Sequence, residues 1–383
     1  MMKVSIIGAG TMGCGIAQIA ATKGHTVCLY DSFDGAIDNA KIKITKILNR
    51  LVEKERITLQ EQNDITERIQ FTNDIKNIKE SKLVIEAIIE DLKLKQDIFN
   101  KIEDIVEKKC IIATNTSSLS IASIAGSCKN PERVIGIHFF NPAPLMPLVE
   151  IIPSIQSSDE TINHAKSIID SWQKITVLTK DTPGFIVNRV ARPFYGEAIR
   201  IYEEGIADFS TIDWSMREIG VFRMGPFELM DYIGNDINYT VTETVFTAFY
   251  YDPRYKPSFT QKRMMEAGYL GRKSGKGFYD YSKEIPEPIK DRDLAKKILW
   301  RILSMLINEA ADALYLNIAT KEDIDLAMTK GVNYPKGLLV WADEIGINSI
   351  LNELERLKKL YGEDRYRPSP LLKIMVRDSK TFY

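Results

Sequence analysis

Long hydrophobic runs and an excess of charge of either sign are missing from this 383-residue sequence. No apolar run approaches the roughly 18 residues that a membrane-spanning helix needs. The 51 Lys and Arg residues nearly balance the 52 Asp and Glu residues, so no overall field favours nucleic acid or an anionic membrane. We therefore predict no nucleic-acid partner and no membrane partner, and any basic site has to be local.

Cysteine motifs are also missing. Cys14, Cys28, Cys110 and Cys128 show no C-x-x-C spacing, which predicts free thiols in a reducing compartment and neither a disulfide framework nor a metal site. The chain enters a strand at Lys3 without a basic-then-apolar leader. We therefore expect no signal peptide and a cytoplasmic location.

What the sequence does have begins with a glycine-rich turn after a short apolar strand at residues 4–7. The turn has the G-x-G-x-x-G spacing and opens a helix, as in a dinucleotide-binding fingerprint. In that motif the first glycine permits the tight turn, the second lets the backbone approach a pyrophosphate, and the third lets helix pack on strand. Amides of the helix N-terminus face the phosphates. The predicted cofactor-binding residues of the turn are Gly8, Gly10, Thr11, Met12 and Gly13.

A second strand at residues 27–30 ends in Asp31, 21 residues beyond Gly10. A carboxylate at this position would bind both ribose hydroxyls and repel a 2′-phosphate. The sequence therefore predicts NAD, and not NADP, as the cofactor.

Apolar strands alternate with amphipathic helices as far as about residue 182, which predicts a Rossmann-type doubly wound α/β sheet over residues 1–182. Loops at the carboxyl ends of parallel strands line the ligand crevice of such a sheet. Glu90, Ser117 and His138 all fall in such loops. Ser117 or Ser118 is equally suited to cap a short helix near residues 119–125.

His138, one of only three histidines, follows an apolar strand that breaks at Asn141-Pro142. The next strand carries Glu150. A histidine and a carboxylate on neighbouring strands are what a general base and its orienting partner require. A lone histidine at a strand end is more often a core residue, and the motifs around His138 are what favour a catalytic interpretation.

An amphipathic helix predicted over residues 34–55 presents many lysines opposite its apolar stripe. Such lysines are usually a solvated face, and they could also receive a polyphosphate group of a substrate. A glycine-rich basic loop at residues 271–278 has a similar pair of interpretations: it contacts cofactor phosphate or ribose, or it is a flexible tail.

The second half of the chain is helical and repeats itself. A turn cluster at residues 181–184 ends the alternating pattern, and a long helix predicted over 185–204 carries Asn188 in its first turn. Pairs 112 residues apart then match: Glu197 with Glu309, Asp213 with Asp325, Gly225 with Gly337, and Asp231 with Asp343. We predict two tandem all-α domains, 183–282 and 293–383, joined by a linker at 283–292.

The second copy carries Trp300 where the first carries Asn188, so it lacks that polar group and is expected to be structural. If single-copy relatives pair through this helical domain, the second copy could occupy the partner's place. The chain would then be a pseudo-dimer within a monomer, although a higher oligomer stays open.

Taken together, the motifs resemble the 3-hydroxyacyl-CoA dehydrogenase family, which includes 3-hydroxybutyryl-CoA dehydrogenases. The resemblance implies that His138 is the catalytic base, that Glu150 is its partner, and that Ser117 and Asn188 bind the reacting oxygen. It places Asp31, Glu90, Lys95, Ser117, Asn141 and Lys273 around NAD, and Lys54 beside coenzyme A. Ile47 stands where relatives often carry a serine facing coenzyme A.

The function that these expectations describe is reversible, NAD-dependent oxidation of a short- or medium-chain (S)-3-hydroxyacyl-CoA, a step of fatty acid β-oxidation. The chemistry needs a hydride acceptor, a base for the hydroxyl proton, and donors for the oxygen that becomes a carbonyl. Two alternatives stay open: a dehydrogenase of hydroxy sugar acids such as gulonate, and a catalytically idle NAD-binding structural protein.

Overall fold

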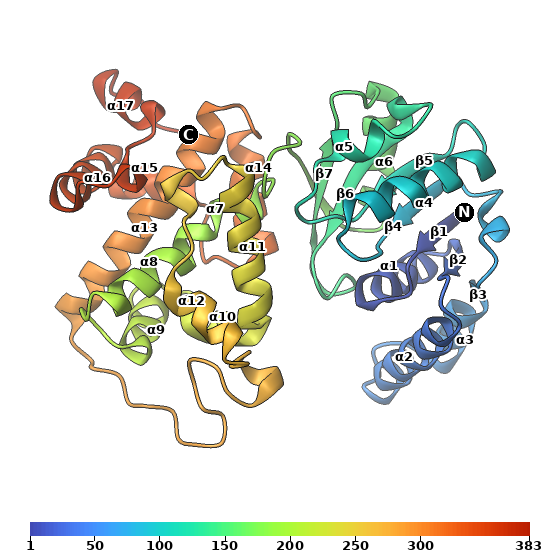
Figure 1. Ribbon diagram of the computed structural model, residues 1–383, viewed down its shortest axis with the longest axis horizontal. Helices are drawn as coiled ribbons and strands as arrows, with labels where there is room; N and C mark the ends of the chain where they lie inside the picture. Colours follow the sequence, from blue (N-terminus) through green and yellow to red (C-terminus); the bar gives the residue numbers. More distant parts are fainter. The chain divides into compact units, whose positions relative to one another are not determined.

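The computed structural model describes residues 1–383, and the chain divides into two compact units, Met1–Thr182 and Pro183–Tyr383 (Figure 1). None of the helices combines the length and apolar character that crossing a bilayer requires.

The first unit is built on an eight-stranded, mostly parallel sheet with the order β3-β2-β1-β4-β5-β6-β7-β8. Only β6 and β7 run antiparallel to each other. The strand order reverses between β1 and β4, which creates the crevice where doubly wound sheets bind their ligands. The strands are β1 Lys3–Ile7, β2 Thr26–Tyr30, β3 Ile69–Thr72, β4 Leu83–Glu86, β5 Ile111–Thr114, β6 Val134–Phe139, β7 Leu148–Pro153 and β8 Ile175–Leu178.

Helices cover both faces of this sheet, so the central strands are buried on both sides and read as nearly continuous apolar runs. Ile6 packs with the helices α1 and α2, whereas its neighbour Ile7 packs with Phe99 of α4, as the two-residue period of a strand requires. The helices of the unit are α1 Thr11–Thr22, α2 Asp34–Glu53, α3 Leu59–Glu67, α4 Leu92–Ile105, α5 Ile121–Ala125 and α6 Asp159–Ser171.

Two local details differ from the sequence prediction. The helix predicted over 34–55 ends at Glu53, and a separate helix α3 follows, started by a capping box in which Thr58 and Glu61 bond to each other's backbone amides. The short helix α5 is capped by Ser120, whose side chain accepts from the amide of Ser123. The alternative in which Ser117 or Ser118 caps this helix is therefore wrong.

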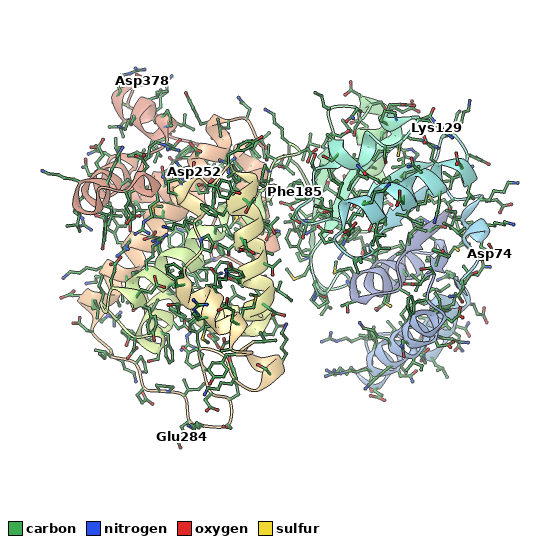
Figure 2. The ribbon with its side chains drawn as sticks, in the orientation of Figure 1. Asp74, Lys129, Phe185, Asp252, Glu284 and Asp378 are labelled. Carbon is green, nitrogen blue, oxygen red and sulfur yellow. The ribbon has the colours of Figure 1, made fainter.

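The regular elements of the second unit are all helices, apart from isolated β-bridges within residues 271–280, and its longest helix, α13, packs along α8 and α9 (Figure 1). Residues 284–291 form neither helix nor strand, and Glu284, labelled in Figure 2, is the first residue of this segment. The helices are α7 Val187–Val190, α8 Arg192–Glu203, α9 Phe209–Glu218, α10 Pro226–Ile233, α11 Asn235–Ala248, α12 Phe259–Glu266, α13 Arg292–Tyr315, α14 Lys321–Gly331, α15 Leu338–Ile345, α16 Ile347–Tyr361 and α17 Pro370–Arg377.

The single helix predicted over residues 185–204 is wrong. Two helices, α7 and α8, share this segment and are separated at Ala191. Pro193 lies in the first turn of α8, where its missing amide costs no hydrogen bond, but the same proline cannot continue a helix from the preceding turn. Asn188 is therefore a residue of the short helix α7.

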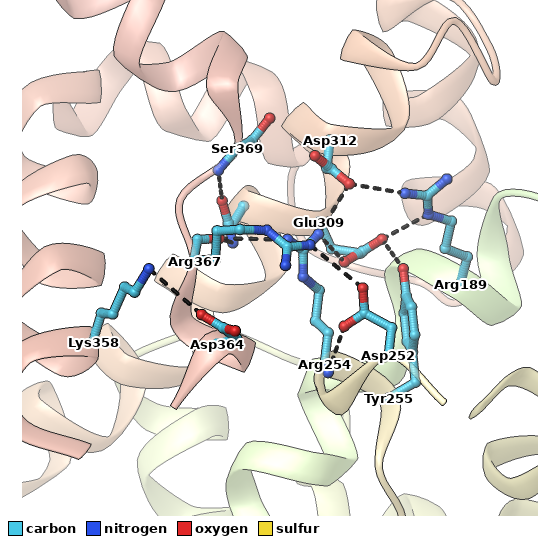
Figure 3. A network of polar contacts seen from close by, with 11 residues as sticks. Arg189, Asp252, Arg254, Tyr255, Glu309, Asp312, Lys358, Asp364, Arg367 and Ser369 are labelled. Carbon is cyan, nitrogen blue, oxygen red and sulfur yellow. Dashed lines mark hydrogen bonds and ion pairs between the residues drawn. The ribbon is translucent and has the colours of Figure 1, made fainter. Parts of the chain in front are cut away.

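Two buried carboxylates tie α13 to the helices before it. Glu309 on α13 receives hydrogen bonds from Arg189 Nε at 2.6 Å, from Arg254 at 3.1 Å, and from the hydroxyl of Tyr255 (Figure 3). On the other side, Glu197 of α8 receives a bond from Arg301 Nε at 2.9 Å. Because charges taken out of water have to be paired, these contacts fix which helix faces pack together.

Candidate active site

The dinucleotide turn has the close approaches that its glycines predict. Gly8 has φ +104°, and a Cβ built on it would lie 2.7 Å from the carbonyl oxygen of Ala87. A Cβ on Gly13 would lie 1.8 Å from the carbonyl oxygen of Gly8, so helix α1 packs directly on the turn. No atom lies within 4 Å of the Cβ position at Gly10. The turn is closed toward the protein and open on the side where a pyrophosphate would lie.

Asp31 at the end of β2 faces this turn. Its Oδ2 accepts from the amide of Ala9 at 2.8 Å, and its Oδ1 accepts from the amide of Phe33 at 3.0 Å. Gly10 caps helix α1 without a side chain, so the first turn of the helix offers its amides to a ligand. The turn, the uncapped helix and the carboxylate fit the diphosphate and ribose of NAD.

A partly buried polar cluster lies at the carboxyl ends of β4 and β5. Glu90 accepts hydrogen bonds from the hydroxyls of Thr116 and Ser118 and from the amide of Ser117. Burial alone would raise the pKa of Glu90, but the ammonium of Lys95 and these donors hold that pKa below its ordinary value. Glu90 is thus an anion fixed beside Ser117.

Lys95 was predicted to line the NAD site, and its side chain is only 1% exposed. Its Nζ lies 2.6 Å from Glu86 Oε1 and 3.3 Å from Glu90 Oε2. Glu86 in turn accepts from the hydroxyl of Thr114 at 2.7 Å. The buried ammonium of Lys95 therefore orients Glu90. A direct contact of Lys95 with the cofactor stays a prediction.

His138 and Glu150 are a directly opposed pair on the antiparallel strands β6 and β7. His138 Nδ1 lies 2.7 Å from Glu150 Oε2. Glu150 is fully buried and His138 is 6% exposed. The ring of Phe140 lies 4.5 Å from the imidazole, centroid to centroid. A carboxylate held in this way fixes the tautomer of the ring and stabilises a proton on it.

The end of β6 is tied to the end of β5. The side chain of Asn115 accepts from the amide of Phe139 at 2.8 Å, directly after His138. Ser117 lies two residues beyond Asn115, and its amide donates to Glu90 at 3.1 Å. Ser117 and Glu90 therefore lie in the loops after β5 and β4, whereas His138 is the last but one residue of β6 itself and not a loop residue; Asn141 lies in the loop after β6.

A cleft of about 770 Å³ opens in the first unit between α1, α2 and the loop that follows β6. Asn141, Ile47 and Lys54 line it, and no carboxylate does. Six cationic side chains line the cleft: Lys23, Lys43, Arg50, Lys54, Arg56 and Lys174. Sequence patterning had singled out only the lysines of one helix. Such a cleft suits an anionic, partly apolar ligand.

Asn188 and Lys273 belong to the second unit. Asn188 is half-buried on α7, and its carbonyl accepts from Arg192 Nε at 2.9 Å. Lys273 Nζ pairs with Asp236 at 2.6 Å. Asp231 accepts from the amides of Phe278 and Tyr279, both at 3.0 Å, which ties the 271–278 loop to α10. The interpretation of this loop as a loose tail is wrong.

The comparisons with known proteins cover the whole chain. The family profile of the 3-hydroxyacyl-CoA dehydrogenase NAD binding domain matches residues 3–182, and that of the C-terminal domain matches 184–281 and 298–381. A 3-hydroxyadipyl-CoA dehydrogenase of Escherichia coli K12 is 36% identical, with 97% of this chain and 96% of that protein aligned. A 3-hydroxybutyryl-CoA dehydrogenase of Clostridioides difficile is 40% identical over 74% of this chain and 100% of that protein.

Solved structures agree. A crystal structure of 3-hydroxybutyryl-CoA dehydrogenase from Escherichia coli K12 superposes with a TM-score of 0.94 at 35% identity, covering 98% of both chains. That of an (S)-3-hydroxybutyryl-CoA dehydrogenase from Ralstonia eutropha has a TM-score of 0.71 at 40% identity, covering 74% of this chain and all of that one. The chain belongs to the 3-hydroxyacyl-CoA dehydrogenase family and is an NAD-dependent oxidoreductase.

Proposed function

We propose that this enzyme interconverts a short- or medium-chain (S)-3-hydroxyacyl-CoA and the corresponding 3-oxoacyl-CoA, with His138 as general base and acid. The observation that carries the proposal is the buried pair of His138 and Glu150, 2.7 Å apart at the end of β6. It lies in the unit that also carries the dinucleotide turn. An imidazole suits this role because it takes and returns a proton near neutral pH.

Each residue of the pair has one task in the reaction. Bound NAD would supply the hydride acceptor for the carbinol carbon. Glu150 holds the proton of His138 on Nδ1, so Nε2 is the atom that takes the hydroxyl proton during oxidation and returns it during reduction. As positive charge develops on the ring, the buried carboxylate stabilises it. The hydroxyl of Ser117, in the same unit, donates to the substrate oxygen as it becomes a carbonyl.

The basic cleft supports the CoA part of the proposal. Coenzyme A carries several phosphate charges, and six cations without a carboxylate line this cleft. Lys54 stands at the C-cap of α2 among them. Ile47, 37% exposed, presents an apolar surface where a hydroxyl would add a hydrogen bond. A hydroxy sugar acid has one carboxylate and would leave most of these cations unmatched.

We further propose that residues 293–383 are a second copy of the helical domain 183–282 and that the chain is a pseudo-dimer. The contacts of the buried carboxylates support this, because they are reciprocal. Arg189 of the first copy bonds Glu309 of the second, and Arg301 of the second bonds Glu197 of the first. Both pairs of equivalent residues are 112 positions apart.

Other contacts repeat with the same offset. Asp213 accepts from the amides of residues 227 and 228, and Asp325 accepts from those of residues 339 and 340. The rings of Phe222 and Tyr334, also 112 residues apart, meet edge to face at 5.0 Å, as residues beside a two-fold axis would. Sedimentation equilibrium should give a monomer of 43.5 kDa. An obligate dimer through the first copy would refute the pseudo-dimer.

The CoA assignment is tested with two substrates that share a reacting group. The rate of NADH oxidation is measured with acetoacetyl-CoA and with acetoacetyl-N-acetylcysteamine, which lacks the nucleotide. We expect kcat/KM to be at least tenfold higher for the CoA thioester, and Lys54→Met to narrow this gap. Lys108→Met, an exposed lysine outside the cleft, is the control. Equal values for both substrates would refute the CoA site.

A further inference from the structure

The loop between β6 and β7 forms one wall of the basic cleft. Its segment 141–147 begins at Asn141, three residues after His138, and Pro142, Ala143, Pro144 and Leu145 of this segment all line the cleft. On one side it lies against helix α1: a Cβ on Gly15 would be 3.2 Å from Ala143 Cβ and 3.1 Å from Pro144 Cδ. The amides of Leu145 and Met146 both donate to the carbonyl of Pro142, which folds the loop into a turn.

On the other side the loop is held by the amide of Ile175, which donates to the carbonyl of Pro147 at 2.8 Å, and by one ammonium. Lys174 stands between α6 and β8, and its Nζ donates to the carbonyls of Ala143 and Met146, each at 2.6 Å. The residue is 8% exposed. A buried lysine usually pairs with a carboxylate, and no carboxylate lines this cleft. Two backbone carbonyls thus serve as the partners of this cation.

The surroundings of Lys174 disfavour its charge. Burial, and then the neighbouring Lys23, lower the pKa of Lys174 to about 8. The other charged groups facing the cleft are all cations: Lys23 at the C-cap of α1, and those of α2 and the segment after α2. Trp172, two residues earlier, also lines the cleft and donates its indole N–H to His25, whose pKa burial lowers. An anionic ligand in the cleft would relieve this concentration of positive charge.

We propose that Lys174 is a positioning residue for the acyl-CoA site: its ammonium holds the 141–147 loop as the wall of the cleft and adds positive potential for the CoA phosphates. The inference rests on the proposed function. Lys174 acts on substrate binding and takes no proton from the substrate, so its loss changes KM for acyl-CoA and leaves the hydride-transfer machinery in place.

The test uses the full-length enzyme with NADH and acetoacetyl-CoA between pH 6.5 and 9.5. Lys174→Met should raise KM for acetoacetyl-CoA at least tenfold at pH 7, while kcat and KM for NADH change by less than about threefold. In the wild type, KM for acetoacetyl-CoA should rise as the pH passes about 8, since the cation is lost there. Lys174→Arg, which keeps its charge, should show no such rise.

Lys108→Met is the matched control, and thermal unfolding shows whether each variant is folded. Should both Lys174 variants fail to fold, Lys23→Met decides, because removing that neighbouring cation should move the rise in KM to higher pH. Any one of three results overturns this inference and leaves the proposed function standing. They are an unchanged KM for acetoacetyl-CoA in folded Lys174→Met, a rise of that KM with pH that persists in Lys174→Arg, and a rise with pH that Lys23→Met does not move. A wild type that neither turns over nor binds acetoacetyl-CoA in calorimetry overturns the proposed function and this inference with it.

Discussion

Replacing Glu150 by glutamine asks how much of the rate depends on the carboxylate charge. Glutamine keeps the size of the side chain but carries no charge, and its amide group can donate to Nδ1 and so favour the wrong tautomer of His138. The carboxylate is fully buried and lies 2.7 Å from the ring, so solvent does not screen the interaction.

The magnitude follows from that geometry. A unit negative charge about 4 Å from the centre of a protonated ring, at an effective dielectric constant of about 20, stabilises it by about 4 kcal/mol. Since each 1.36 kcal/mol is roughly a factor of ten in rate, kcat should fall by about a thousandfold.

The assay is single-turnover oxidation of NADH with saturating acetoacetyl-CoA, which isolates the chemical step from product release. Glu160→Gln, an exposed glutamate on α6, is the matched control and should keep the wild-type rate. Tight binding of NADH by Glu150→Gln, followed by fluorescence, shows that the dinucleotide site is intact. A rate within threefold of the wild type would mean that the carboxylate does not support proton transfer.

Three further predictions concern the cofactor, the helical unit and pH. Asp31→Ser should shift the ratio of kcat/KM for NADH over NADPH at least tenfold toward NADPH, because the carboxylate that repels a 2′-phosphate is gone; an unchanged ratio counts against its role. Glu309→Ala removes a carboxylate that two buried arginines share, and it should lower the free energy of unfolding by about 3 to 5 kcal/mol in urea denaturation. Asp364→Asn, which breaks an exposed ion pair, is the control and should lower the free energy of unfolding by less than about 1 kcal/mol. Folding lowers the pKa of Glu90, so the ionised side chain stabilises the fold at a pH above 4.5, its ordinary pKa, and this contribution is lost as the pH falls below that value. Glu90→Gln should therefore flatten the loss of thermal stability between about pH 5 and 3. An equally steep loss in the variant would contradict the ionised state of Glu90.

Much of the first unit could be predicted from the sequence because its signals are local. The glycine turn and Asp31 are fixed by spacing, and the opposition of His138 and Glu150 follows from two apolar strands joined by a short loop. The burial of Lys95 was missed because a helical lysine is normally exposed. Glu86 gave a signal for it, since a carboxylate at the end of an apolar strand needs a cation.

Features built from distant segments could not be predicted in the same way. The basic cleft gathers cations from the end of α1, from α2 and the segment after it, and from the turn before β8. No pattern along one helix shows that Lys174 lines the same cleft as Lys54. The break at Ala191 could have been found, because Pro193 stands inside the predicted helix. The 112-residue offset makes Arg189 and Arg301 equivalent residues. Which glutamate each of them bonds depends on how the helices pack, and the sequence does not show that.

The central claim is that His138 moves the proton of a 3-hydroxyacyl-CoA. The most direct test is spectrophotometric oxidation of NADH with acetoacetyl-CoA by the wild type and by His138→Ala. We predict turnover by the wild type, and a variant that still binds NADH and acetoacetyl-CoA but is slower by a factor of about 10² to 10⁴, the usual contribution of a general base. An inactive wild type would contradict the reaction, and a variant at full rate would contradict the base.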